Sequence, residues 1–224
     1  MTGRLFESEG PAGGDRRTPV PEAEAPLAVR MRPKTLDELV GQEHLLADGS
    51  TLRTAIETGE PHSMVLYGPP GSGKTTLARI VAAAARGAFE EESAVNAGRA
   101  EVRAVIDRAA ERRRATGQPT IFFLDEIHRF NKAQQDALLP AVEEGVLTLI
   151  GATTENPYFE VNSALLSRCA VYELESLSDE ELAAVVARGA ADLAIEVTPG
   201  VTEAIVRRAG GDARSALGTL ELAW

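Results

Sequence analysis

One stretch of the chain has the residue types and spacing of a phosphate-binding site. It follows the apolar run Met64–Tyr67 and precedes a helical pattern. Its glycines allow backbone N–H groups to turn inward around an anion, and a following helix adds the positive end of its dipole. A lysine suits the outer phosphates of a nucleotide, and the hydroxyl after it suits Mg²⁺. We therefore expect nucleotide binding by Gly68, Pro69, Pro70, Gly71, Ser72, Gly73, Lys74, Thr75 and Thr76.

Two adjacent carboxylates, Asp125 and Glu126, end a second apolar run, Ile121–Leu124. Neighbouring side chains of a strand point to opposite sides, which suits a division of roles. We expect Asp125, with Thr75, to hold Mg²⁺, and Glu126 to orient and polarise an attacking water. Two solvent-facing acids would give the same local pattern, but their position 50 residues after Thr75 favours the catalytic interpretation.

A third apolar run, Leu147–Ile150, leads to the hydroxyls of Thr153 and Thr154. Ligands of open α/β sheets bind at the carboxyl ends of the strands. A hydroxyl here could contact the γ-phosphate or the attacking water. A simple turn would equally explain the following Asn156-Pro157.

These residues need a scaffold, and the hydrophobic pattern predicts one. Expected strands are Met64–Tyr67, Thr120–Leu124, Leu147–Ala152 and Ala170–Glu173, with Phe89–Val95 as a less regular further strand. Expected helices between them are Asp48–Thr58, Lys74–Arg86, Glu101–Ala115 and Lys132–Glu144. Strands that alternate with helices indicate an α/β fold with a parallel sheet.

The pattern changes at both ends of this sheet region, which we place at residues 26–176. Residues 1–25 are rich in Gly, Pro, Glu and Ala and predict a disordered tail, although Leu5-Phe6 could form a docking peptide. Residues 177–224 contain helix-start signals at Ser178, Thr198-Pro199 and Asp212. They predict a small all-helical lid domain.

The gross composition excludes several classes. The 224-residue chain is 44% hydrophobic and 25% charged, as in globular proteins, and no apolar run is long enough for a membrane span. Its single cysteine, Cys169, allows no internal disulfide and fits a reducing cytosol. The net charge of −11 argues against a protein that simply coats nucleic acid. One arginine-rich strip could contact DNA or be a solvated helix face: Arg99, Arg103, Arg108, Arg112, Arg113 and Arg114.

The order of the motifs resembles that of AAA+ ATPases of the clamp-loader clade. Longer stretches resemble the family of replication-associated recombination protein A and Werner helicase-interacting protein 1. These stretches are Arg30–Pro33, Val40–Leu46, His62–Met64, Asp125–Asp136 and Ile150–Cys169. The resemblance covers about residues 26–224.

The resemblance implies roles for particular residues. It places Val40 and Gly41 near the adenine of ATP, and makes Thr154, with Thr153 as the other choice, the sensor 1 residue. Arg168 resembles the arginine finger, which acts in the neighbouring subunit's site, and Arg214 resembles sensor 2, which reaches from the lid to the γ-phosphate. By composition alone, both arginines would be assigned to ordinary surface ion pairs. The expected catalytic set is Lys74, Glu126, Thr154, Arg168 and Arg214.

The family also implies a function: a Mg²⁺-dependent ATPase that acts as a DNA-directed motor in replication-fork maintenance and recombination. Expected partners are single-stranded, forked or gapped DNA and replication proteins such as single-stranded DNA-binding protein, in a cytoplasmic, nucleoid-associated setting without membrane. The alternative is a clamp-loader-like subunit that uses ATP binding as a switch. A protein unfoldase is a third candidate, but no aromatic pore loop is recognisable. Relatives form homo-oligomers through a region beyond the lid, so assembly of this shorter chain is in question.

Overall fold

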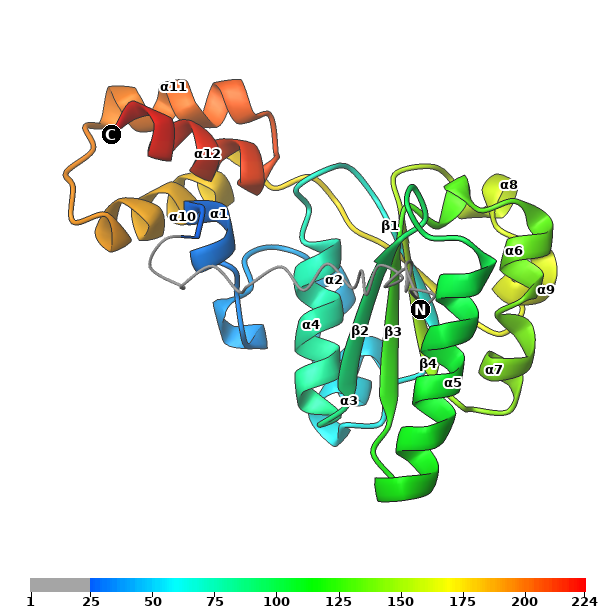
Figure 1. Ribbon diagram of the computed structural model, residues 1–224. Coiled ribbons are helices and arrows are strands. Elements are labelled where there is room, and N and C mark those ends of the chain that lie inside the picture. The colour runs from blue at the N-terminus through cyan, green and yellow to red at the C-terminus, as the bar shows by residue number, and fades with distance from the viewer. Residues whose placement is uncertain (1–24) are drawn as a thin grey trace, which may run out of the picture.

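The computed structural model describes residues 25–224, shown in colour in Figure 1. The predicted disordered tail, apart from its last residue, and the docking peptide at Leu5-Phe6 lie outside the described residues.

The centre of the fold is a five-stranded, all-parallel sheet with the strand order β2-β3-β4-β1-β5. The strands are β1 (Met64–Tyr67), β2 (Ala88–Ser93), β3 (Thr120–Asp125), β4 (Thr148–Thr153) and β5 (Ala170–Glu173). The sheet confirms the predicted α/β class and each expected strand to within about two residues at each end. Because all strands run the same way, the polar residues that follow β1, β3 and β4 meet at one edge.

Strand β2 is the irregular strand of the sequence, and its place at the edge of the sheet explains its three glutamates. Glu90 lies between Arg108 and Arg112, which approach its carboxylate to 2.8 Å each. Burial alone would raise the pKa of Glu90, but the hydrogen bonds and charges of these two arginines outweigh it and lower the pKa. Glu91 pairs with Arg79. An edge strand can carry such charges because one side of it is not covered by another strand.

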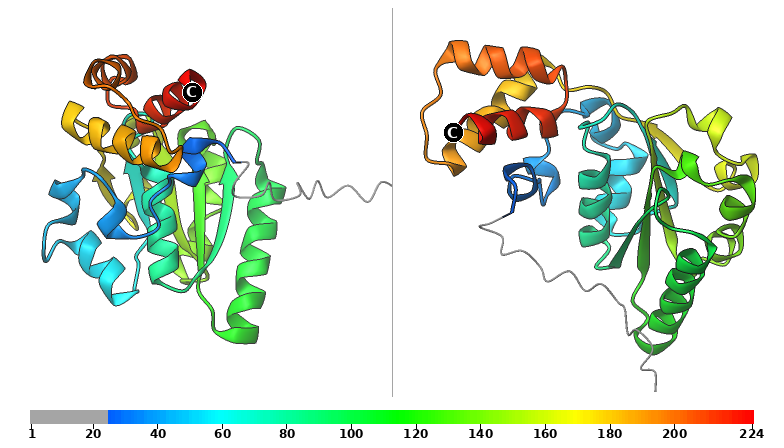
Figure 2. Two further views of the ribbon diagram at one scale, coloured as in Figure 1. Left: turned by 90° about the vertical axis from the view of Figure 1, so that its left-hand side faces the viewer. Right: turned by 45° about the horizontal axis from the view of Figure 1, so that its top comes forward.

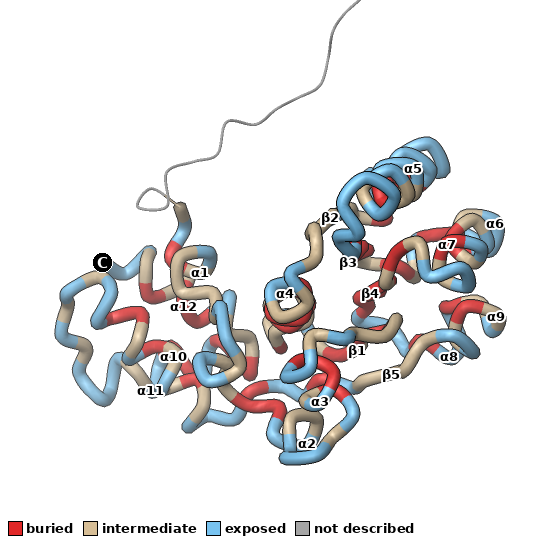
Figure 3. Tube along the Cα trace, turned by 90° about the horizontal axis from the view of Figure 1, so that it is seen from below, coloured by how far each residue is buried: buried red, intermediate tan, exposed pale blue. Residues whose placement is uncertain are grey.

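Alternate residues of β3 divide the core into two layers, since successive side chains of a strand face opposite sides. Phe122 and Leu124 pack with α5 (Arg99–Thr116), α7 (Leu139–Glu143) and α9 (Ser163–Leu166). Ile121 and Phe123 pack with α3 (Thr51–Thr58) and α4 (Lys74–Ala84). Figure 3 shows these helices on the two faces of the sheet, with buried residues between them.

Two helix predictions need correction. The helix expected at Asp48–Thr58 begins at Thr51, because Ser50 is its N-cap and accepts from the Arg53 N–H. The helix expected at Lys132–Glu144 is two helices, α6 (Lys132–Asp136) and α7. Pro140 lies in the first turn of α7. A proline there has no N–H to continue the hydrogen-bond ladder of the preceding helix.

Short helical turns connect the larger elements. They are α1 (Leu27–Arg30), η2 (Leu36–Glu38), α2 (Glu43–Leu46), η3 (Ile127–Arg129) and α8 (Pro157–Glu160). None was predicted, because three or four residues are too few to display helical periodicity.

The C-terminal residues form a helical module of α10 (Asp179–Asp192), α11 (Pro199–Ala209) and α12 (Ala213–Ala223). Ser178 forms the predicted capping box, and Asp212 caps α12 through the Ser215 N–H. Thr198 occupies the N-cap position of α11 but makes no side-chain cap hydrogen bond. Figures 1 and 2 show the module beside one end of the sheet. The domain boundary at residue 177 stays a prediction.

Helix α1 packs with this module, although it precedes the sheet in sequence. The Leu27 side chain is fully buried in the same cluster as Leu182 and Leu217. Its backbone N–H donates to Glu221 Oε1 at 2.9 Å. No helix within residues 25–224 is long and apolar enough to span a membrane.

Candidate functional site

The phosphate-binding loop connects β1 to α4, as the sequence predicts. Gly68 has a φ of +150°, and a Cβ on it would lie 2.2 Å from the Leu174 carbonyl oxygen, so only glycine fits there. Gly73 is the N-cap of α4, and its carbonyl accepts from the Leu77 N–H. The Ser72 hydroxyl donates to the Pro69 carbonyl at 2.9 Å. The loop is thus a rigid turn that ends at the positive end of a helix.

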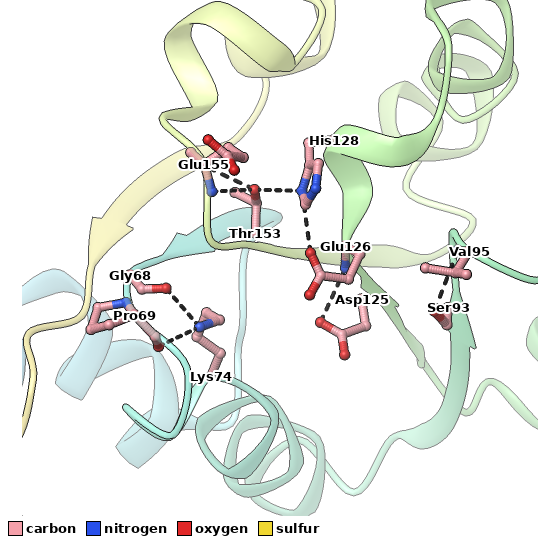
Figure 4. Close-up of polar contacts among 10 residues, drawn as sticks. All are labelled: Gly68, Pro69, Lys74, Ser93, Val95, Asp125, Glu126, His128, Thr153 and Glu155. Atoms are coloured by element: carbon pink, nitrogen blue, oxygen red, sulfur yellow. Dashed lines mark hydrogen bonds and ion pairs between the residues drawn. The ribbon is translucent and has the colours of Figure 1, made fainter. Parts of the chain in front are cut away.

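The Lys74 side chain folds back over this loop. Its Nζ donates to the carbonyls of Gly68 at 2.8 Å and Pro69 at 2.7 Å, as Figure 4 shows. Burial lowers the pKa of Lys74, while the negative charges of Asp125 and Glu126 act in the opposite direction. A cation that is partly stripped of water has much to gain from a phosphate.

A single pocket contains most of the predicted site residues. The predicted residues that line it are Val40, Pro70, Gly71, Ser72, Gly73, Lys74, Thr75, Thr76, Asp125, Glu126, Thr154 and Arg214. Residues from the sheet region and from the helical module therefore meet at one place. The predicted residues outside this lining are Gly41, Gly68, Pro69, Arg168 and Thr153, the other choice for sensor 1.

Gly41 packs against the helical module instead. A Cβ on it would lie 2.7 Å from Leu177 Cδ2, and its φ is +78°. Its neighbour Gln42 bonds to the backbone of the segment that follows β5. The Gln42 Nε2 donates to the Glu175 carbonyl at 2.8 Å and Gln42 Oε1 accepts from the Glu175 N–H.

The two carboxylates stand at the end of β3, as predicted. Asp125 is the last residue of the strand, and its Oδ1 accepts from the Glu126 N–H at 3.1 Å. Glu126 has a left-handed backbone with φ +54°, which costs a side-chain-bearing residue roughly 1–3 kcal/mol. This turn separates the directions of the two acids. The Glu126 carboxylate lies 3.3 Å from His128 Nδ1.

The two threonines at the end of β4 have different surroundings. Thr153 is fully buried, and its Oγ1 lies 2.9 Å from both His128 Nδ1 and the Glu155 N–H nitrogen. Thr154 is exposed and lines the pocket. The geometry therefore gives Thr154 the access to a ligand that a sensor residue needs, while the Thr153 hydroxyl is engaged inside the protein.

Arg168 lies beyond α9, outside the pocket of its own chain. Its Nη2 is 2.5 Å from Glu143 Oε1, and its Nη1 donates to the Ala164 carbonyl at 2.6 Å. The ion pair expected from composition is present. A role in a neighbouring subunit stays a prediction.

The helical module contributes Arg214 and two residues that sequence reasoning missed, Asp212 and Arg188. Asp212 touches the phosphate-binding loop so closely that a Cβ on Gly71 would lie 1.9 Å from Asp212 Oδ1. Arg188 donates to the Glu38 carbonyl at 2.7 Å. The Gly-Asp-Ala-Arg stretch was a signal for Asp212; nothing in the sequence pointed to Arg188.

The arginine-rich strip lies on α5. Four of its six members contact neighbouring elements: Arg108 and Arg112 bind Glu90, Arg99 donates to the Ala133 carbonyl and Arg113 to the Gly145 carbonyl. These contacts support the interpretation as a charged helix face more than a strip kept for DNA.

Comparison with known proteins gives this geometry a context. Residues 64–176 match the model of the "ATPase family associated with various cellular activities (AAA)". The chain is 52% identical over 204 residues to replication-associated recombination protein A of Escherichia coli strain K12. The matched region covers 88% of this chain and 45% of that protein. It is 44% identical over 210 residues to ATPase WRNIP1 of Dictyostelium discoideum, covering 89% and 23% respectively.

Among solved structures, the chain is similar to the RuvB Holliday junction branch migration motor of Thermotoga maritima. The TM-score is 0.71 at 31% identity, over 85% of this chain and 64% of that one. The predicted family resemblance and fold are confirmed. The chain spans less than half the length of the two curated relatives named here.

Proposed function

The chain belongs to the AAA family of ATPases, and we propose that its pocket binds ATP with Mg²⁺ and hydrolyses it to ADP and phosphate. One observation carries the proposal. The loop residues Lys74 and Thr75, the acids Asp125 and Glu126, and the helical-module residue Arg214 line the same pocket.

The loop would hold the phosphates through its backbone N–H groups, with the Lys74 ammonium moving from its two carbonyl partners to the outer phosphate oxygens. Val40 and other apolar residues on the module side of the pocket would accommodate the base. Val40 fits the predicted adenine role, whereas Gly41 would act only by letting the helical module approach.

Thr75 and Asp125 would hold Mg²⁺. Within residues 25–224 there is no cluster of three or more His, Cys, Asp or Glu side chains that could bind a metal. Mg²⁺ commonly takes one or two protein ligands and completes its shell with phosphate oxygens and water, so two oxygen ligands beside the loop fit it. The ion would neutralise charge on the phosphates.

Glu126 would orient the attacking water and accept its proton. Thr154 would contact the γ-phosphate or that water, and Arg214 would link the γ-phosphate to the helical module. Arg168 would complete the site of an adjacent subunit, where a guanidinium stabilises charge on the transferring phosphoryl group.

We further propose that the whole protein is a DNA-directed motor that acts in replication-fork maintenance and recombination. The support is the likeness to proteins named for replication-associated recombination and for Holliday junction branch migration. DNA, a second copy of the chain and single-stranded DNA-binding protein are the proposed partners, and the cytoplasm with the nucleoid is the proposed location. The alternative, a clamp-loader-like switch, would depend on ATP binding more than on turnover.

Glu126→Gln separates the two functions. The amide keeps the size of the side chain but cannot take up a proton, so we expect ATP binding to persist and DNA-stimulated hydrolysis to fall by roughly 10²–10⁴-fold. Phosphate release with and without single-stranded DNA measures this, and titration of a fluorescent ATP analogue serves as the binding control. Turnover unchanged by the substitution would favour the switch, and stimulation by unfolded protein instead of DNA would favour an unfoldase.

A further inference from the structure

A largely buried histidine lies between the ends of β3 and β4. His128 belongs to η3, directly after β3, and only 10% of its side chain is exposed. Its Nδ1 faces two oxygens: Glu126 Oε2 at 3.3 Å and Thr153 Oγ1 at 2.9 Å. Figure 4 shows the ring between these two residues, which come from the ends of β3 and β4.

The partners of Thr153 determine which atom donates. The Thr153 Oγ1 accepts from the Glu155 N–H at 2.9 Å and lies 3.3 Å from the Glu155 carbonyl, toward which it can donate its own proton. A hydroxyl has one proton to give, so its remaining lone pair is directed at His128. A carboxylate only accepts. A proton on His128 Nδ1 therefore makes the hydrogen bond to Thr153 Oγ1 and also faces the Glu126 carboxylate at 3.3 Å, an electrostatic contact and not a second hydrogen bond. A bare Nδ1 would instead face the Glu126 carboxylate lone pair to lone pair.

The Nδ1–H of His128 limits the conformations of the Glu126 side chain. Glu126 has a left-handed backbone, and its side chain is about one-third exposed and lines the pocket. An exposed glutamate has several rotamers of similar energy. A fixed N–H on the buried ring beside it selects among them. The same ring is anchored to Thr153, whose neighbour Thr154 lines the pocket.

We propose that His128 is a positioning residue: through its Nδ1–H it holds the Glu126 carboxylate in register with the end of β4, so that the water-orienting acid and the Thr154 hydroxyl move as one unit. The inference rests on the proposed role of Glu126 in hydrolysis. It adds His128 to the site and gives a positioning role to Thr153, whose carbonyl also accepts from the Gly68 N–H of the phosphate-binding loop at 3.2 Å.

The test compares substitutions at His128 in the whole protein. His128→Ala removes the donor, and we expect the turnover number for ATP to fall roughly 10- to 100-fold with unchanged ATP affinity, as for a catalytic group that is slightly misplaced. His128→Asn retains an N–H donor near the position of Nδ1 and should recover most of the rate. His62→Ala is the matched control, because His62 also bonds a side chain, the Tyr172 hydroxyl, but lies before β1 at the other end of that strand. It should leave the rate unchanged.

Thr153 supplies an independent arm. Thr153→Val removes the hydroxyl and should slow turnover, while Thr153→Ser keeps the hydroxyl and should not. If the two residues act as a unit, His128→Ala combined with Thr153→Val costs little more than His128→Ala alone. Additive losses would overturn the proposal, as would an Asn variant no faster than the Ala variant, or a loss of ATP affinity in step with the rate.

A second readout does not depend on activity. The chain has three histidines, so nitrogen-15 NMR can assign their ring nitrogens, and we expect a proton on His128 Nδ1 whose signal shifts in Thr153→Val. A bare Nδ1 would overturn the inference even in an inactive preparation. Failure of the proposed hydrolysis would appear differently, as Glu126→Gln turning over like the unsubstituted protein.

Discussion

At the scale of single residues, Lys74 would exchange its hydrogen-bond partners when the proposed complex forms. Its ammonium is partly stripped of water, and the atoms nearest to it are two neutral carbonyl oxygens. Hydrogen bonds to ionised phosphate oxygens are stronger than those to carbonyls. The residue is thus ready to exchange weak partners for strong ones.

Replacing this lysine tests that view. For Lys74→Ala we expect ATP affinity to fall roughly 10- to 100-fold, the effect of losing charge-assisted hydrogen bonds, with little change in thermal stability. Lys132→Ala is the matched control, because Lys132 is exposed on α6 and is not among the residues that line the pocket. Calorimetric titration with a non-hydrolysable ATP analogue measures both variants. Equal affinities for the two would refute the assigned site.

At the scale of elements, α1 is the piece whose position follows least from its place in the chain. This four-residue helix precedes the sheet in sequence but packs against the C-terminal helices, with the Leu27 side chain fully buried in their core. Residues from α1 and the turn after it, including Met31 and Arg32, also line the pocket. The helical module is therefore tied to the pocket by both ends of the described chain.

Leu27→Ala should loosen this tie. Removing a fully buried leucine side chain typically costs about 2–5 kcal/mol, so we expect faster amide hydrogen exchange in α10 and α12 with little change in β3 and β4. Val29→Ala on the same short helix is the control, because Val29 is 48% exposed and such substitutions change stability by about 0.5 kcal/mol or less. Unchanged exchange in Leu27→Ala would mean that α1 contributes nothing to the module.

The sequence predicted the elements whose signals are local and repeated. The positions of the strands and the caps at Ser178 and Asp212 depend on neighbouring residues, and each was found. The break between α6 and α7 was missed although Pro140 signalled it, because the prediction followed the helical period of residues 132–144 and gave no weight to a proline in the interior of that helix. The position of α1 was missed because it depends on the contact of Leu27 with residues almost 200 positions away.

For the site, motifs predicted which residues gather but not what they contact. Lys74, Asp125 and Glu126 meet as expected. The link from Glu126 through His128 to Thr153 was not predicted, because it depends on how two strand ends are set beside each other.

At the scale of the whole molecule, the position of Arg168 outside the pocket of its own chain favours a site shared between copies. The Glu143 carboxylate holds the guanidinium in the single chain. An ion pair between exposed side chains is weak, at about 0–1 kcal/mol, so a phosphate from an adjacent copy can displace it.

Mixing two inactive variants tests whether the site is shared. Arg168→Ala and Glu126→Gln, each in the whole protein, should both hydrolyse ATP poorly, by about 10³-fold for the arginine. In a mixed assembly, some interfaces join an intact Glu126 to an intact Arg168, and hydrolysis should return. The control mixes the doubly substituted chain with either single variant. No interface in such a mixture joins an intact Glu126 to an intact Arg168, so hydrolysis should not return. No recovery, despite assembly shown by mass measurement with an ATP analogue, would place Arg168 outside the reaction.

The close approach of Asp212 to Gly71 means that the residues allowed at one of these positions depend on the residue at the other. A methyl group at position 71 would collide with the carboxylate that starts α12. The glycine is therefore required twice, by its own left-handed backbone and by a residue 141 positions downstream. In chimaeras that exchange lids between related proteins, compatibility should depend on this one pair more than on overall sequence likeness.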